Sequence, residues 1–184
     1  SLTIPPREQW RIIVGAGLGI LLTGALSRWC APAGAAWLIA PIGASTVLVF
    51  AIPSSPLAQP WSIVGGNTLS ALAGTVCAWL VPDLGLAAAL AVSLAIGAML
   101  LARCVHPPGG AAALLVVLSN HPSWSFVAFP VLFNSVLLVL AAMAYHSATG
   151  HTYPHRSTPE REPNSTADTN RFTRADLDAA LLHY

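Results

Sequence analysis

The near absence of charge over most of the chain constrains its fold more than any other feature. Between Ile12 and Ala148 the only charged side chains are Arg28, Asp83 and Arg103. Over the whole sequence 55% of the residues are hydrophobic and 8% are charged, whereas soluble domains carry about 25% charged residues. So few charges cannot keep a globular domain in solution. We therefore expect an integral membrane protein whose main partner is the lipid bilayer.

Four apolar stretches are long enough to cross a bilayer as helices. A helix rises 1.5 Å per residue, so crossing the hydrocarbon core takes about 20 apolar residues. The stretches cover about 10–29, 62–82, 84–103 and 125–147. All are rich in Ala and Gly, which allow close helix packing in lipid. The sequence therefore predicts an all-α membrane domain over about 8–150.

Two further apolar stretches are short or interrupted. The first, 36–52, is broken at Pro41 and Gly43. The second follows the segment CVHPPGG (104–110) and contains about ten apolar residues, roughly half of a membrane crossing. These stretches are predicted to be re-entrant half-helices or the halves of broken spans.

The two interrupted stretches resemble each other. When 41–56 is laid over 107–122, the identical pairs are Pro41 with Pro107, Gly43 with Gly109, Leu48 with Leu114, and Pro56 with Pro122; one inserted residue then aligns Asn67 with Asn134. A long apolar span precedes and follows each copy. This order predicts a two-fold internal repeat with halves at about 10–82 and 84–148. Six crossings would make the halves inverted, and four crossings with two re-entrant segments would make them parallel.

The charged ends of the chain indicate how it is oriented in the membrane and where the apolar part gives way to a polar segment. Arginines flank the first span and follow the last: Arg7, Arg11, Arg156, Arg161, Arg171 and Arg174. Arginine favours the cytoplasmic side, so we expect both termini there. The segment 151–171 is polar and reads as a flexible linker. Residues 172–184 resemble the start of a helix capped at Thr173, which indicates that a further cytoplasmic domain follows in the intact protein.

Broken helices give a membrane protein a way to bind anions without a formal charge. Backbone N–H groups left free at the start of a half-helix, together with the helix dipole, form a positive site. Repeated breaks of this kind serve this purpose in transporters. The candidate substrate-binding residues are Pro41, Gly43, Ala44, Ser45, Thr46, Asn67, His106, Pro107, Pro108, Gly109, Gly110 and Asn134. The alternative is that the breaks and the asparagines serve helix packing alone.

His106 is either a neutral, hydrogen-bonded ring or a group that holds a proton and helps to bind an anion. Arg103 is either an interfacial side chain or an attractor for anions, and His121 and His146 are interpreted as interfacial. Cys104 and His106, two residues apart, are weak grounds for a metal site, so no metal or cofactor is expected.

Other function classes find little support. No hydrolase, kinase or metalloprotease motif occurs, and Asp83 is the only carboxylate between Glu8 and Glu160. An enzyme is therefore not expected. No basic patch indicates nucleic acid, and the shortage of carboxylates argues against a cation pathway.

The motif HPPGGA (106–111) and the stretch PIGASTVLVFAIPSSPLAQPWSIVGGNTLSA (41–71) resemble the HPP family of integral membrane proteins, over about 8–155. The family is described with four spans, and its plant and cyanobacterial members are linked to nitrite transport. The resemblance implies a transporter or channel for nitrite or a similar monovalent anion. Many bacterial members continue into cytoplasmic CBS domains, which implies a bacterial inner-membrane protein. A non-transporting anchor or sensor for such domains is the alternative. We also expect a homo-oligomer and leave proton coupling open.

Overall fold

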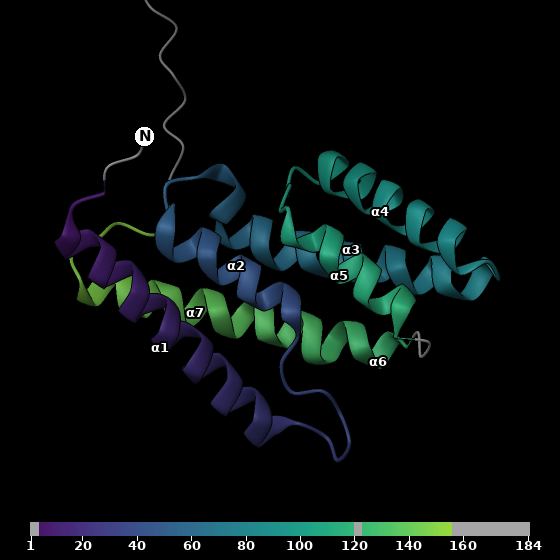
Figure 1. Cartoon of the computed structure of the whole chain (residues 1–184), viewed down its shortest axis with the longest axis horizontal. Coiled ribbons are helices and arrows are strands. Elements are labelled where there is room, and N and C mark those ends of the chain that lie inside the picture. The colour runs from purple at the N-terminus through teal and green to yellow at the C-terminus, as the bar shows by residue number, and fades with distance from the viewer. Residues whose placement is uncertain (1–3, 120–122, 156–184) are drawn as a thin grey trace, which may run out of the picture.

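The computed structural model describes residues 4–119 and 123–155 (Figure 1). Its elements are α1 (Pro6–Cys30), α2 (Ala40–Ala51), the 3₁₀ turn η1 (Pro56–Ala58), α3 (Pro60–Leu80), α4 (Leu84–Leu101), α5 (Pro108–Leu118), α6 (Trp124–Phe126), the π-helical segment η2 (Val127–Leu132) and α7 (Phe133–Ala148). No strand occurs in these two ranges. The predicted all-α membrane fold is confirmed. The predicted linker beyond His155 and the helix start at 172–184 lie outside the described residues.

Four helical segments are long and apolar enough to cross a membrane: α1, α3, α4 and the run from α6 to α7, Trp124–Ala148. They correspond to the four spans expected from the sequence. The helices α2 and α5 are shorter apolar helices, as the interrupted stretches predicted.

Local sequence explains where these helices begin. Proline occupies the first turn of α1, α2, α3 and α5, where its missing N–H has no partner to lose and its fixed φ suits the helix. At α4, the Asp83 carboxylate accepts a hydrogen bond from the Leu86 N–H at 2.7 Å, a standard N-cap.

Each short helix, with the segment that precedes it, lies against a long helix. The extended residues before α2 lie against the second half of α1, where Trp37 contacts Gly24, and Phe50 at the end of α2 lies beside Gly15 near the start of α1. Likewise Trp61, at the start of α3, donates to the Ala102 carbonyl at the end of α4. From there α5 runs alongside α3, and its Ala113 packs on Gly74.

The two halves of the chain therefore run in opposite directions. In Figure 1, α2 runs from the middle of the molecule towards the end that holds the N-terminus, whereas α5 runs towards the end where α3 meets α4. The four long segments are long and apolar enough to cross a membrane, and α2 and α5 are shorter apolar helices. Opposite directions of α2 and α5 are what the inverted alternative with six crossings predicts. The contact of Arg11 with His146 places both described ends together.

The last span is not the single helix that the sequence predicted over 125–147. Phe129 is extended within it (φ −137°, ψ 120°), directly before Pro130. Proline removes a backbone donor and its ring clashes with the preceding turn, which explains the break. The span therefore comprises α6, the π-helical η2 and the regular α7.

Close packing of α3 on α5 depends on glycine. A Cβ at Gly74 would lie 2.6 Å from the Ala113 carbonyl oxygen and 3.1 Å from its Cα. Because the obstructing atoms belong to the backbone, they cannot move aside as a side chain would. Gly74 thus sets how closely the second short helix approaches the long helix beside it.

We predict that Gly74→Ala lowers the free energy of unfolding by about 1–3 kcal/mol, the usual cost of overpacking a tight contact. Gly97→Ala is the matched control, since a Cβ at Gly97 meets no atom within 4 Å. Unfolding in mixed detergent micelles measures both. Equal stability of the two variants would contradict this packing.

Candidate functional site

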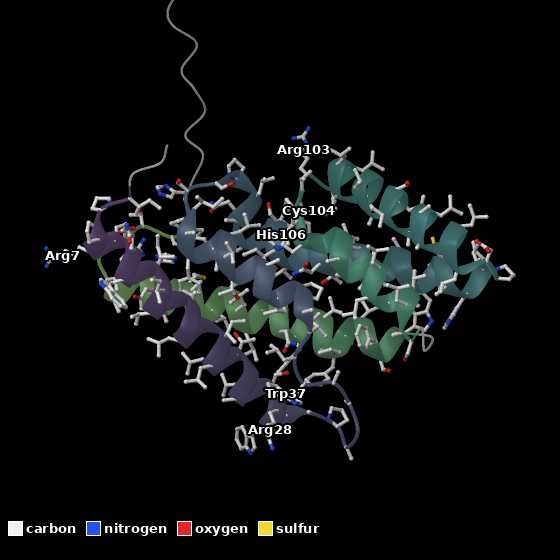
Figure 2. All side chains as sticks on the ribbon, in the orientation of Figure 1. Arg7, Arg28, Trp37, Arg103, Cys104 and His106 are labelled. Atoms are coloured by element: carbon white, nitrogen blue, oxygen red, sulfur yellow. The ribbon has the colours of Figure 1, made fainter. Side chains whose placement is uncertain are left out.

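His106 lies in the connection between α4 and α5, enclosed by the protein. Figure 2 shows it among the ribbons, whereas Arg103, three residues earlier, points away from the molecule. The imidazole is 0% exposed. Its Nδ1 lies 2.8 Å from the Leu57 carbonyl oxygen in η1. A carbonyl only accepts hydrogen bonds, so Nδ1 carries a proton.

The second ring nitrogen faces a group that can either donate or accept. His106 Nε2 lies 2.7 Å from the Ser45 hydroxyl oxygen of α2, which is also 3.1 Å from the Pro41 carbonyl. With a neutral ring, Ser45 donates to Nε2. With a protonated ring, Nε2–H donates to Ser45, and the hydroxyl turns to Pro41. Both charge states thus keep their hydrogen bonds without movement of the heavier atoms.

Asn67 of α3 joins this pair to the last span. Its Nδ2 donates to the Ser45 hydroxyl at 3.3 Å and to the Ser135 hydroxyl of α7 at 3.1 Å. The Ser135 hydroxyl in turn donates to the Val131 carbonyl at 2.8 Å. Side chains from both halves therefore meet in one buried network.

Several buried polar atoms near this network have no partner within the described part of the chain. They are Oδ1 of Asn67, the Ser70 hydroxyl one helical turn further along α3, and both amide atoms of Asn134, the neighbour of Ser135. All three residues are 0% exposed. Buried polar atoms normally have a protein, water or ligand partner. We call His106, Ser45, Asn67, Ser70, Asn134 and Ser135 the polar centre.

The polar centre contains no carboxylate. The acidic residues of the described ranges are Glu8 and Asp83. Glu8 pairs with Arg11 near the start of α1, and Asp83 caps α4. The centre therefore offers hydroxyl, amide and imidazole groups to a ligand, with no negative charge to repel an anion or attract a cation.

The structure brings only some of the predicted site residues together. His106, Ser45, Asn67 and the Pro41 carbonyl meet, and Asn134 is buried beside Ser135. The others lie elsewhere or are engaged locally: Gly43, Ala44 and Pro107 are exposed, Pro108 is buried, Gly110 is half-buried, and Thr46 donates to the Ile42 carbonyl.

The first turn of α5 uses its own N–H groups. The Gly109 N–H donates to the His106 carbonyl at 2.8 Å, and the Gly110 N–H donates to the Pro107 carbonyl at 3.1 Å. Gly109 also packs tightly, since a Cβ there would lie 2.6 Å from the Ser70 hydroxyl oxygen. At the start of α5 these N–H groups are therefore engaged within the protein.

The site residues predicted from the sequence did not include Ser70, Ser135 or Leu57. Leu57 contributes its backbone carbonyl. Every residue has one, so the residue type could not predict this contact.

His146 was interpreted as interfacial, but it is 0% exposed. Its Nε2 donates to the Val49 carbonyl at 2.9 Å, and Arg11 lies 3.3 Å from its Nδ1. The ring is therefore enclosed by α1, α2 and α7 beside Arg11, and its interfacial position in the membrane stays a prediction. His121 lies outside the described residues.

In the described ranges, no three His, Cys, Asp or Glu side chains are placed so that they could share a metal ion. Cys104 is buried and unpaired, close to Gly65.

Comparison with known proteins places the chain in a family. Two transmembrane proteins of Dictyostelium discoideum are each 37% identical to it, over 125 and 126 residues. The matches cover 64% of this chain but only 44% and 40% of those relatives, so the chain spans less than half of their length. No solved structure matches. The family model described as "HPP, transmembrane region" matches residues 2–154. This chain, whose buried His106 is the histidine of the motif, therefore belongs to the HPP transmembrane family.

Proposed function

We propose that the protein transports a small monovalent anion, with nitrite as the first candidate, and that the anion binds at the polar centre. The observation that carries this proposal is the fully buried His106 ring, whose Nε2 faces a hydroxyl in a neutral network with unpaired polar atoms. We do not propose an enzyme, although the Ser45 hydroxyl and His106 Nε2 lie 2.7 Å apart, the distance of a nucleophile and its base.

Electrostatics links the anion to a proton. A buried imidazolium is costly unless a counter-charge accompanies it, and no carboxylate of the described chain supplies one. An anion about 4 Å away would stabilise the imidazolium by about 4 kcal/mol at an effective dielectric constant of 20. That energy corresponds to roughly a thousandfold in proton affinity. The anion and the proton therefore favour each other, and we propose that they move together.

We propose that the two halves are inverted repeats and that they supply a route for such a cycle. Transporters with inverted repeats and broken helices hold substrate where the repeats meet and open alternately to each side. Here Ser45 belongs to the first half and His106 to the second, so motion of one half against the other changes the contact between them. We further propose a homo-oligomer in the bacterial inner membrane, with both termini in the cytoplasm.

The first test is uptake of nitrite into liposomes that contain the purified chain. We predict that His106→Ala lowers the initial rate about tenfold or more, because it removes the only ionisable group of the polar centre. His151→Ala is the matched control, since His151 is partly exposed and outside the centre. It should stay within about twofold of wild type.

Size-exclusion profiles confirm folding before flux is compared. If the wild-type protein carries no nitrite, nitrate, formate or chloride, the transport proposal is wrong. The alternative function, a non-transporting membrane anchor or sensor, is then favoured. If both histidine variants transport like wild type, transport stands and the proposed site is wrong.

The pH dependence of uptake tests proton coupling separately. Ser45→Ala removes the acceptor for Nε2–H of the charged ring, and a bond to a charged group contributes about 1 kcal/mol more than a neutral one. The protonated state is then disfavoured, so the pH at which uptake falls to half should decrease by roughly 0.5–1 unit. Ser93→Ala is the control, because Ser93 is exposed and donates only to the Ala89 carbonyl. Uptake that is independent of pH in wild type would contradict coupling.

A further inference from the structure

The chain that follows α7 does not leave the bundle directly. Tyr153 is 8% exposed, and its hydroxyl donates to the Ala58 carbonyl at 2.8 Å. Burial raises the pKa of Tyr153, so the hydroxyl keeps the proton that it donates. Two residues later, the His155 backbone N–H donates to Oε1 of Gln59 at 2.9 Å. Residues 153–155 are thus attached to η1 and to the residue after it.

The same short turn holds the histidine of the polar centre. The Leu57 carbonyl, between Pro56 and Ala58 in η1, accepts from His106 Nδ1. A turn of three residues has little stability of its own, so its position depends on the side chains around it. Gln59 ties it to the Ser55 carbonyl at 2.8 Å and to the Pro53 carbonyl at 3.0 Å. Tyr153, which follows α7, adds a buried contact to the same turn through its bond to the Ala58 carbonyl.

We propose that Tyr153 is a positioning residue for His106. It holds η1 in place, and through the Leu57 carbonyl it fixes the proton on Nδ1 and keeps Nε2 directed at Ser45. Without the tyrosine hydroxyl, the buried Ala58 carbonyl has no partner, and η1 relaxes to recover one. The Leu57 carbonyl then moves away from Nδ1. Only the transport readout of this inference rests on the proposed function.

The surroundings of His106 leave few other groups that set its protonation. The groups that contact it from neighbouring elements are uncharged: the Leu57 carbonyl, the Ser45 hydroxyl, the Met99 sulfur and the Gly66 backbone. In its own connection, the titratable or charged side chains are Arg103 and Cys104. Of these contacts only the Leu57 carbonyl belongs to η1, so a substitution that acts on His106 through η1 must act through that bond.

The test compares two tyrosines that make the same kind of bond. Tyr145 also donates its hydroxyl to a backbone carbonyl, that of Arg11, at 2.8 Å, but α1 carries that carbonyl and η1 does not. Tyr153→Phe and Tyr145→Phe are prepared in the full chain and reconstituted in liposomes. Deuterium exchange at the C2 carbon of His106 is measured by mass spectrometry, and the pH profile of nitrite uptake is measured beside it.

We expect Tyr153→Phe to raise the exchange rate at His106 about threefold or more, because a freed ring samples more conformations and more water. The pH at half-maximal uptake should shift by about half a unit or more, and Tyr145→Phe should change neither quantity. Gln59→Met, which also loosens η1, should act in the same direction as Tyr153→Phe and serves as the second variant if the phenylalanine variant does not fold.

Two results would overturn the inference. One is a Tyr153→Phe variant whose exchange rate at His106 and pH profile of uptake equal those of the wild type. The other is an equal change in both tyrosine variants, which would indicate a general loss of stability. If wild type transports no anion, the proposed function fails, and exchange at His106 alone decides the role of Tyr153.

Discussion

The hydrogen bond from His106 Nδ1 to the Leu57 carbonyl is the contact on which the arrangement of the polar centre depends. It fixes which ring nitrogen carries the proton, so the other nitrogen faces Ser45. It also joins the connection before α5 to the turn before α3, and thereby the second half of the chain to the first. Asn67 extends the network to α7. The network therefore connects helices that are far apart in sequence.

The break before α5 is compatible with lipid because its backbone groups find partners within the protein. An unsatisfied N–H or carbonyl in hydrocarbon costs several kcal/mol, so irregular backbone survives only where protein or water receives it. Here the His106 N–H donates to the Met99 sulfur, the His106 carbonyl accepts from Gly109, and the Ala102 carbonyl accepts from Trp61. These bonds satisfy part of the irregular backbone before α5 within the protein.

The sequence was sufficient to predict the spans and part of the site. Apolar stretches of membrane length have few other folds. The alignment of the two interrupted stretches singled out Asn67, and the residues at the two breaks included Ser45 and His106. The outward position of Gly43 and Ala44 was also readable, since Pro41 and Ser45 share a helix face four residues apart while the residues between them lie on other faces. By contrast, Leu57 contributes a backbone atom and Tyr153 a contact across the fold. The sequence pattern predicts neither contact, because both depend on how helices distant in the sequence pack together.

Magic-angle-spinning NMR of the protein in bilayers, with ¹⁵N-labelled histidine and ¹³C-labelled leucine carbonyls, measures the central contact most directly. A His106→Asn sample identifies the His106 signals by their loss. The account predicts that Nδ1 of His106 is protonated and dipolar-coupled to the Leu57 carbonyl carbon. A ring whose only proton is on Nε2, with no coupling to Leu57, would contradict it.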